Sequence, residues 1–384
     1  MPFSFQLDAQ DPATGARAGR FVTRHGEVLT PAFLPVGTAG SVKSLAPDDL
    51  SAAGCDILLC NTYHLMLRPG SATVRHMGGL HRFMGWDGAL LTDSGGFQVM
   101  SLTELNRVHE EGVEFRSHLD GALEFLTPER VMDVQADLGS DIAVTLDHAV
   151  PLPVEAAAQR DAGERTLRWT ERSLRHARGL ETPSGMKQLL FGIVQGGGDP
   201  ELRREMAERT ACMACDGFAI GGLSVGETKE ETWALARATA EALPADLPRY
   251  LMGMGTPLDL LDGIACGIDL FDCVLPTRNA RNGMAFTSEG PVNIRNAEHA
   301  RSDRPLDPSC GCEACATFTR AYLRHLHLAQ EILAHRMLTL HNVTFYQTLM
   351  AAARRAIERG DLSAYAREFS ARYRERGGDP PAPP

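Results

Sequence analysis

The chain has 384 residues, of which 43% are hydrophobic and 23% are charged, as in an ordinary globular protein. It is long enough for one large α/β barrel, and no window of about 18 uninterrupted apolar residues suggests a membrane span. The net charge of −11 excludes a chain that is basic throughout, although a local basic patch can still contact RNA. The N-terminal residues carry no signal-peptide pattern, so we expect a cytoplasmic protein.

Eight short apolar runs follow one another along the chain, and most are continuous rather than alternating. Continuous runs are typical of parallel strands that are buried on both faces. Helical patterns separate several of the runs, which predicts a (β/α)8 TIM barrel, with a doubly wound open sheet as the alternative fold. The runs are residues 32–36, 56–60, 89–93, 141–146, 189–194, 217–221, 250–253 and 268–272.

Two segments do not fit a plain barrel. Residues 113–126 contain two strand-like runs around Asp120-Gly121, which predicts a β-hairpin insertion. The segment 276–341 contains two arginines and three closely spaced cysteines. We therefore expect four parts: a barrel body at 1–275, an arginine loop and zinc-binding subdomain at 276–341, a C-terminal helical part completing the barrel at 342–373, and a disordered tail at 374–384.

The strongest local signal is the segment CGCEAC, which contains Cys310, Cys312 and Cys315. Together with His341 these thiolates complete a tetrahedral Zn²⁺ shell without an open position, which predicts a structural rather than a catalytic metal. Three buried free thiols are the alternative interpretation. Other histidines compete for the fourth position: His325, His327 and His335.

Polar residues and glycines follow the predicted strands, where a barrel carries its catalytic groups. Three runs end in or are followed at once by a carboxylate, at Asp93, Asp147 and Asp272. Two others lead to Gln195 and Gly222. Carboxylates and an amide suit a ligand that presents N–H donors and a carbonyl, as guanine does. One aspartate alone is often a helix N-cap, but three together favour a binding site.

The chain also contains several longer motifs. They are NTYHLMLRPG (61–70), TDSGGFQVMSL (92–102), GIVQGG (192–197), GGLSVGE (221–227), LMGMGTP (251–257), DLFDCVLPTRNARNG (269–283) and the cysteine cluster. These motifs resemble the signatures of the tRNA-guanine transglycosylases, in the family order and across nearly the whole chain. We expect no extra C-terminal RNA-binding module such as the archaeal relatives carry, so the resemblance is to the bacterial type.

The resemblance implies a pentosyltransferase of queuosine biosynthesis. Such enzymes exchange the wobble guanine in the anticodon of certain tRNAs for 7-aminomethyl-7-deazaguanine (preQ1). Asp272 matches the family's nucleophile, which forms a covalent ribosyl–aspartate intermediate, so that the exchange is a double displacement. Asp93 matches the general acid/base. The family is typically homodimeric, and we expect the same here.

The resemblance also implies a base-binding pocket. Asp147 and Gln195 match the residues that bind the purine edge, and the Gly222 N–H matches the donor to the base carbonyl. Phe97 and Met252 match the pair that sandwiches the ring, although the family often has Tyr at the position of Phe97.

The loop after Gly222 matches the part that distinguishes one incoming base from another. The Leu223 carbonyl would accept from the aminomethyl group, and Glu227 would orient that peptide. Val225 favours preQ1, because eukaryotic enzymes that use queuine carry Gly at this position. Queuine remains the alternative incoming base.

Two departures from the bacterial pattern bear on the pocket. Bacterial members usually have Asp-Glu-Cys where this chain has Asp147-His148-Ala149, at the pocket wall. They usually have Gly where this chain has Cys60, just before the NTYH motif.

The basic segment after Asp272 predicts an RNA contact. Arg278 and Arg281 are candidates for binding the anticodon loop, from which the target guanine must be unstacked. A solvated basic loop is the alternative. Two other functions compete: a non-catalytic, zinc-bearing tRNA-binding subunit, and a barrel enzyme for a small metabolite. Intact Asp93 and Asp272 argue against the first, and the zinc and arginine segments argue against the second.

Overall fold

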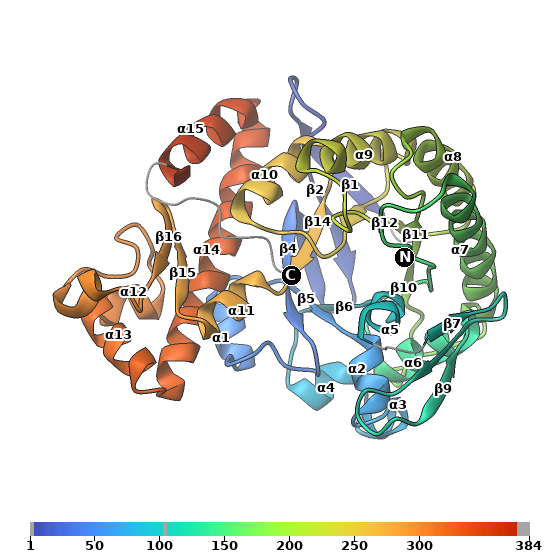
Figure 1. Ribbon diagram of the computed structural model, residues 1–384, viewed down its shortest axis with the longest axis horizontal. Coiled ribbons are helices and arrows are strands. Elements are labelled where there is room, and N and C mark those ends of the chain that lie inside the picture. Colours follow the sequence, from blue (N-terminus) through green and yellow to red (C-terminus); the bar gives the residue numbers. More distant parts are fainter. Residues whose placement is uncertain (1–3, 103–105, 375–384) are drawn as a thin grey trace.

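A computed structural model describes residues 4–102 and 106–374 (Figure 1). Its centre is a closed barrel of eight strands in the spatial order β10-β11-β12-β13-β14-β4-β5-β6, with parallel neighbours. The closed barrel confirms the predicted fold and excludes the open sheet. The strands are β4 (Ala32–Gly37), β5 (Ile57–Cys60), β6 (Ala89–Thr92), β10 (Ile142–Val144), β11 (Leu189–Val194), β12 (Gly217–Ile220), β13 (Arg249–Leu251) and β14 (Leu270–Cys273).

Each barrel strand overlaps one of the eight predicted apolar runs. Apart from the first two residues of β11, every strand residue is buried. Burial on both faces explains why the runs do not alternate, since neither side of the strand meets water. Aliphatic side chains from several strands, among them Leu34, Leu59 and Ile193, share one core cluster.

Helices surround the barrel, and several begin directly after a loop that follows a strand (Figure 1). Thr127, Asp199 and Thr256 cap three of them through their side chains, each with proline in the first turn. The helices of the barrel layer are α1 (Pro47–Ala52), α2 (Thr62–Leu67), α3 (Ser71–His76), α4 (Leu80–Met84), α5 (Gly96–Leu102), α6 (Pro128–Leu138), α7 (Ala156–Ala177), α8 (Pro200–Ala211), α9 (Lys229–Ala242) and α10 (Pro257–Ala265).

The predicted hairpin insertion is present. Strands β8 (Val113–Arg116) and β9 (Leu123–Leu126) pair antiparallel, and Gly121 in the turn between them has a φ of +75°. A short strand, β7 (Asn106–Val108), adds a third member to this sheet.

A second three-stranded sheet, at the start of the chain, was not predicted. It consists of β1 (Phe5–Gln10), β2 (Arg17–Thr23) and β3 (Gly26–Thr30), joined in antiparallel order. Only the first residue of β1 is buried, so its sequence gives a weak hydrophobic pattern.

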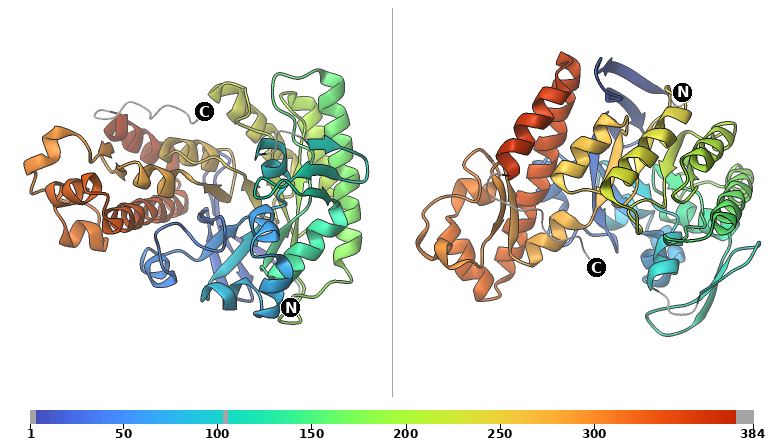
Figure 2. Two further views of the ribbon diagram at one scale, coloured as in Figure 1. Left: turned by 60° about the horizontal axis from the view of Figure 1, so that its bottom comes forward. Right: turned by 45° about the horizontal axis from the view of Figure 1, so that its top comes forward.

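The C-terminal part lies on one side of the barrel (Figure 2). Its long helix α14 packs against β4, α11 and β15 and so helps to enclose the barrel. Residues 275–281 form a short helix rather than the expected arginine loop, and α14 runs continuously through the expected boundary at 342. Residues 375–384 of the expected tail lie outside the described residues. The elements are α11 (Leu275–Arg281), β15 (Met284–Thr287), β16 (Gly290–Asn293), the 3₁₀ helix η1 (Ala297–Arg301), α12 (Glu313–Thr317), α13 (Arg320–Leu328), α14 (Ile332–Arg359) and α15 (Leu362–Arg374).

Within the described ranges, no helix combines the length and the apolar character needed to cross a bilayer.

Candidate active site

The predicted site residues gather at the carboxyl ends of the barrel strands. Asp93 follows β6, Asp147 follows β10, and Asp272 lies in β14. Gln195 follows β11 directly, and Gly222 follows β12. Since all eight strands are parallel, these ends share one mouth of the barrel.

Asp93 lies in a cage of neutral hydrogen-bond donors. Asn61 Nδ2 and Gln98 Nε2 donate to its Oδ2 at 2.6 and 2.9 Å, and the Thr62 N–H donates to Oδ1 at 2.8 Å. Burial raises the pKa of Asp93 to about 6 in spite of these donors, and the charge of Asp272 also raises it. A carboxyl group with a pKa near neutrality can both give and take a proton.

Asp272 is buried, and only one of its oxygens is held. The Tyr250 hydroxyl donates to Oδ1 at 2.6 Å, and the Gly253 N–H donates to the same oxygen at 2.8 Å. No hydrogen bond from the described part of the chain reaches Oδ2. Burial raises the pKa of Asp272, while the two donors oppose that rise. The carboxylate is therefore fixed in orientation with one oxygen left for another partner.

Sequence reasoning missed Tyr250, which belongs to β13 and pairs with Leu270 of β14. A signal was present, because a phenol inside a strand that is buried on both faces needs a hydrogen-bond partner. It also missed Asn61 and Gln98, which lie within the motifs but were given no role. Their amides do not stand out among many polar residues until the fold brings them to Asp93.

Asp147 and Gln195 form a pair at the mouth. Gln195 Nε2 donates to Asp147 Oδ2 at 2.7 Å, and Ser94 Oγ donates to Oδ1 at 3.2 Å. Burial raises the pKa of Asp147, and these hydrogen bonds partly offset the rise. A side chain at Gly96 would bring its Cβ to 2.9 Å from Asp147 Oδ1, so glycine keeps this carboxylate accessible. Together the two residues offer a carboxylate and an amide to one ligand edge.

The loop that follows β12 is held by a carboxylate. Glu227 accepts hydrogen bonds from the N–H groups of Ser224 and Val225, the latter at 3.0 Å, and from Thr232 Oγ1 at 2.9 Å. Burial opposes the charge of Glu227, but these donors prevail and lower its pKa. Leu223, which precedes the first residue that Glu227 binds, is buried.

The two residues expected to sandwich a ring lie at the rim. Phe97 is on α5 and is 56% exposed, while Met252 follows β13 and is half-buried. The structure thus brings the carboxylates, the amide and the loop together, and the roles of the individual side chains stay predictions.

The departures at His148 and Cys60 do not place a new reactive group in the mouth. His148 Nδ1 lies 3.0 Å from Arg165 Nη1, and its backbone N–H donates to Thr166 Oγ1. Burial, aided by Arg165, lowers the pKa of His148 to about 4, so the imidazole is neutral at pH 7. Burial raises the pKa of Cys60 to about 12, which keeps it a thiol packed near Met84.

The two predicted RNA-binding arginines lie on α11, which follows β14 after a single residue. Arg278 is exposed, while Arg281 is half-buried and donates to the Thr277 carbonyl at 3.0 Å. A short helix with two arginines in its last turn therefore follows the strand that carries Asp272.

The cysteine cluster assembles as predicted, and His341 is the histidine that joins it. The sulfur atoms of Cys310, Cys312 and Cys315 and one ring nitrogen of His341 lie within 4.8 Å of one another. His341 Nε2 is 2.7 Å from the Phe286 carbonyl, which makes it the protonated nitrogen and turns Nδ1 toward the sulfurs at 3.2 and 3.6 Å. Three thiols and one oriented imidazole fit a tetrahedral metal, and they join the start of α12 to α14.

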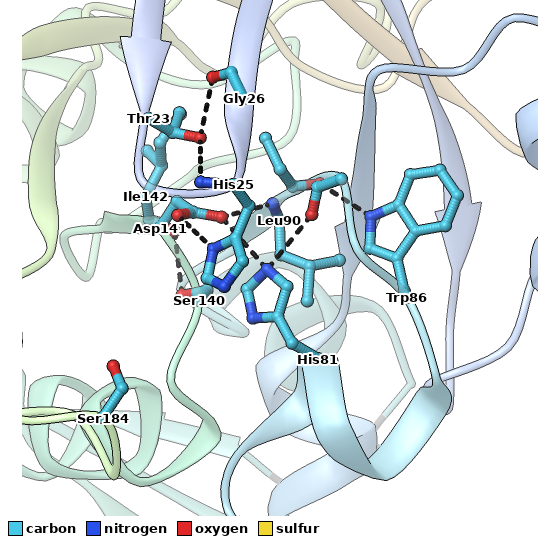
Figure 3. A network of polar contacts seen from close by, with 12 residues as sticks. Thr23, His25, Gly26, His81, Trp86, Leu90, Ser140, Asp141, Ile142 and Ser184 are labelled. Atoms are coloured by element: carbon cyan, nitrogen blue, oxygen red, sulfur yellow. Dashed lines mark hydrogen bonds and ion pairs between the residues drawn. The ribbon is translucent and has the colours of Figure 1, made fainter.

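A second group of potential ligands consists of His25, His81 and Asp141 (Figure 3). It lies at the opposite end of the barrel, because Asp141 precedes a barrel strand. His25 Nδ1 and His81 Nε2 lie 2.8 and 3.2 Å from the two oxygens of Asp141, which precedes β10. The imidazole rings are stacked, with centroids 3.4 Å apart and planes 16° apart. Near-parallel rings direct their nitrogens side by side rather than at one point, so the geometry is that of hydrogen bonds that dock the β2–β3 turn.

Comparison with known proteins agrees with the architecture and the motifs. The family model described as "Queuine tRNA-ribosyltransferase" matches residues 11–375. The chain is 53% identical to the queuine tRNA-ribosyltransferase of Solidesulfovibrio magneticus, over 97% of this chain and 99% of the relative. It is 51% identical to the enzyme of that name from Syntrophobacter fumaroxidans, over 98% and 99% of the two chains. The chain therefore belongs to the queuine tRNA-ribosyltransferase family of pentosyltransferases.

Proposed function

We propose that this chain exchanges the wobble guanine of a tRNA anticodon for preQ1 through a ribosyl ester on Asp272. The observation that carries the proposal is the hydrogen bonding of this carboxylate. Tyr250 and Gly253 hold Oδ1, whereas Oδ2 has no hydrogen bond from the described residues. An oriented carboxylate with one unengaged oxygen, at the mouth of a barrel, suits nucleophilic attack on a sugar carbon.

The proposed reaction has two displacements at the ribose C1′ atom. Asp272 Oδ2 forms a C1′–O bond as the bond to guanine breaks, and the guanine leaves with the bonding electrons. Nitrogen N9 of the incoming base then attacks C1′ and releases the carboxylate. Two inversions retain the configuration, as in retaining glycosidases. The negative charge of Asp272 also stabilises the oxocarbenium-like transition state.

Asp93 is the proposed proton carrier. In the first step it gives a proton to the leaving guanine, and in the second it takes one from the incoming base. Its pKa of about 6 supports both directions near neutral pH. The amides of Asn61 and Gln98 keep the carboxyl group in place while it changes charge.

The proposed base pocket has two parts: a pair of side chains that accept hydrogen bonds, and the loop after β12, which supplies one backbone donor and one backbone acceptor. Asp147 and Gln195 accept from the N–H groups of the purine edge, and the Gly222 N–H donates to the base carbonyl. The Leu223 carbonyl accepts from the aminomethyl group of preQ1, in a peptide that Glu227 orients from behind. Phe97 and Met252 close on the two faces of the ring, and Val225 leaves less room than the Gly of queuine-using enzymes. Queuine stays the alternative incoming base.

The tRNA is the proposed macromolecular substrate, with Arg278 and Arg281 at the anticodon loop. Their place on the helix that follows β14 supports this, since the flipped guanine must reach Asp272. Association into a homodimer remains a prediction, for which sedimentation of the purified chain is the measurement.

Zn²⁺ is the proposed occupant of the Cys310, Cys312, Cys315 and His341 cluster. A metal there would join two helical elements, with no part in the chemistry. Metal analysis of the purified protein should find one zinc per chain, and Cys315→Ser should lose both zinc and folding stability.

The exchange of labelled guanine into tRNA tests the proposed function. We expect incorporation by the wild-type chain, competed more strongly by preQ1 than by queuine, with preQ0, the nitrile analogue of preQ1, as a third competitor. Stronger competition by queuine would show that queuine, rather than preQ1, is the incoming base. No incorporation, with tRNA binding intact, would support a non-catalytic tRNA-binding subunit instead.

A further inference from the structure

Arg203 is a fully buried cation that the reaction described above does not use. It lies in the first turn of α8 and is 0% exposed. Burial lowers the pKa of Arg203 to about 10, with Glu227 acting in the opposite direction, so the guanidinium remains charged at neutral pH. Burying a charge is costly unless it is compensated, and its compensation is therefore informative.

Backbone carbonyls, rather than a carboxylate, bind this guanidinium. Nε donates to the Gly197 oxygen at 2.7 Å, Nη1 to the Gly221 oxygen at 3.1 Å and Nη2 to the Gly222 oxygen at 2.7 Å. Gly197 belongs to the loop after β11, and the other two glycines belong to the loop after β12. One side chain thus joins the two loops that carry the proposed base pocket.

The direction of these carbonyls determines the direction of the adjacent N–H groups. In a trans peptide the C=O and the following N–H point to opposite sides. Because Arg203 binds the carbonyls of Gly221 and Gly222, the N–H groups of Gly222 and Leu223 point away from it. Neither N–H has a hydrogen-bond acceptor among the described residues. Two successive N–H groups of this kind form a concavity that attracts an electron-rich atom.

The next peptides of the same loop are oriented by a carboxylate instead of a guanidinium. Glu227 accepts from the N–H groups of Ser224 and Val225. By the same geometry, the carbonyl of Leu223 points away from Glu227. A buried cation and a carboxylate behind one short loop therefore make it present donors first and then an acceptor.

Glycine is required where this loop passes the purine-edge pair. A Cβ on Gly222 would lie 2.2 Å from Gln195 Oε1, and one on Gly221 would lie 2.7 Å from Gln195 Nε2. Gly222 also has a φ of +63°. The loop cannot retreat from Arg203 toward Gln195, so the guanidinium and the amide hold it between them.

We propose that Arg203 is a positioning residue for base recognition, which aims the Gly222 and Leu223 N–H groups at the carbonyl oxygen of the base and supports them with buried positive charge. The proposal rests on the base pocket proposed above. A leaving guanine carries negative charge that spreads onto its carbonyl oxygen, so this support is stronger in the transition state than in the bound substrate.

The test compares two bases that differ at the carbonyl. Inhibition constants for guanine and for 2-aminopurine, which lacks the carbonyl, are measured for the wild-type chain and for Arg203→Met. We expect the preference for guanine over 2-aminopurine to fall by about tenfold or more in Arg203→Met. A loss of this size is typical when a hydrogen bond to a charged group is removed. Affinity for 2-aminopurine should change little. The preference of Arg203→Lys for guanine should lie between those of the wild type and Arg203→Met.

Arg204→Met is the matched control, because Arg204 is the next residue of α8 and pairs with Glu201 at the surface. It should keep the wild-type preference. A ratio of two constants from one preparation does not depend on how much of the protein is folded. Should Arg203→Met fail to fold, Arg203→Lys and Arg203→Gln decide the matter by the same ratio.

The outcomes separate this proposal from the proposed function. If the wild-type chain does not exchange guanine into tRNA, the proposed function itself is wrong. Normal wild-type exchange together with an unchanged base preference in the Arg203 variants would overturn only the positioning role. A lowered kcat per folded enzyme at saturating guanine would further support the transition-state part, whereas a purely structural role would lower only the folded fraction.

Discussion

The two ends of the barrel both bury carboxylates, but they pair them differently. At the amino end, Asp269 forms an ion pair with Arg17 at 2.6 Å, and Asp141 meets two histidines. At the carboxyl end, Asp93 and Asp272 are held by amides, a phenol and backbone N–H groups. Burial alone therefore does not distinguish the two ends.

The difference lies in whether the partners outweigh the effect of burial on the pKa. Burial tends to raise the pKa of Asp141, but the hydrogen bonds from His81 and His25 outweigh it and the pKa is lowered. Asp93 has only neutral donors around it, and its pKa is raised to about 6. Hydrogen bonds from the two imidazoles keep the pKa of Asp141 low. At Asp93 burial prevails over three neutral donors, so this carboxyl group can exchange a proton near neutral pH. We therefore expect substitutions at the amino end to lower stability and substitutions at the carboxyl end to lower activity.

The largest expected effect is at Asp272. Asp272→Asn keeps the size of the side chain but is a far poorer nucleophile, so guanine exchange should fall by more than about 10⁴-fold. Binding of tRNA should persist, measured by filter retention or anisotropy. Exchange within tenfold of wild type would show that Asp272 is not the attacking group.

Removing a cation at the amino end should instead reduce stability. In Arg17→Met the buried charge of Asp269 loses its partner, which costs about 3–5 kcal/mol in the free energy of unfolding. Denaturant titration measures this, and the folded fraction should keep the wild-type KM for guanine. Arg20→Met is the control, because Arg20 pairs with Asp8 at the surface and should change little. Equal stability of the two variants would contradict the comparison.

The pH dependence of one half-reaction should report Asp93. Only its ionised form can take a proton from the incoming base, so discharge of a preformed ribosyl enzyme by guanine should speed up as pH rises through the pKa of Asp93. This pKa lies below the free enzyme's value of about 6, because Asp272 carries no charge as an ester. The Asn61 amide stabilises the ionised form. Asn61→Ala should therefore raise the pKa of Asp93 and move the rising limb of the pH–rate profile to higher pH, by about one unit.

Asn293→Ala is the control for this profile, since Asn293 lies in β16 of the C-terminal part, outside the donor cage of Asp93. Its limb should coincide with that of the wild type. A downward shift in Asn61→Ala, or a limb that stays in place, would exclude Asp93 as the base of this step.

The smallest expected effect concerns Arg278. Arg278→Ala should weaken tRNA binding and reduce the slope of log K against log salt by about 0.7–0.9, the contribution of one phosphate contact. Arg204→Ala should leave the slope unchanged. A wild-type slope in Arg278→Ala would favour a solvated basic segment with no RNA contact.

The barrel could be predicted because its strands are buried on both faces, and continuous apolar runs are visible in the sequence. The cluster of three cysteines and one histidine could be predicted because its three cysteines lie within six residues, although only the fold distinguishes His341 from its competitors. The N-terminal sheet was missed because β1 is largely exposed. The segment around Arg278 was expected as a loop, and its helix is too short to give a clear periodicity.

The candidate site divides in the same way. The carboxylates could be found at the strand ends, because that position alone suggests a role. Their partners could not, because Tyr250, Asn61 and Arg203 come from three separate segments. Hydrogen bonds between such distant residues depend on the relative positions of strands and loops, which no local pattern reports.

The most direct measurement of the central claim is the site of covalent attachment. Wild-type protein is incubated with tRNA in the absence of a second base, denatured, digested, and its peptides are weighed. We expect a ribosyl adduct on the peptide that contains Asp272, and none in Asp272→Asn. An adduct on Asp93, or one that still forms in Asp272→Asn, would contradict it.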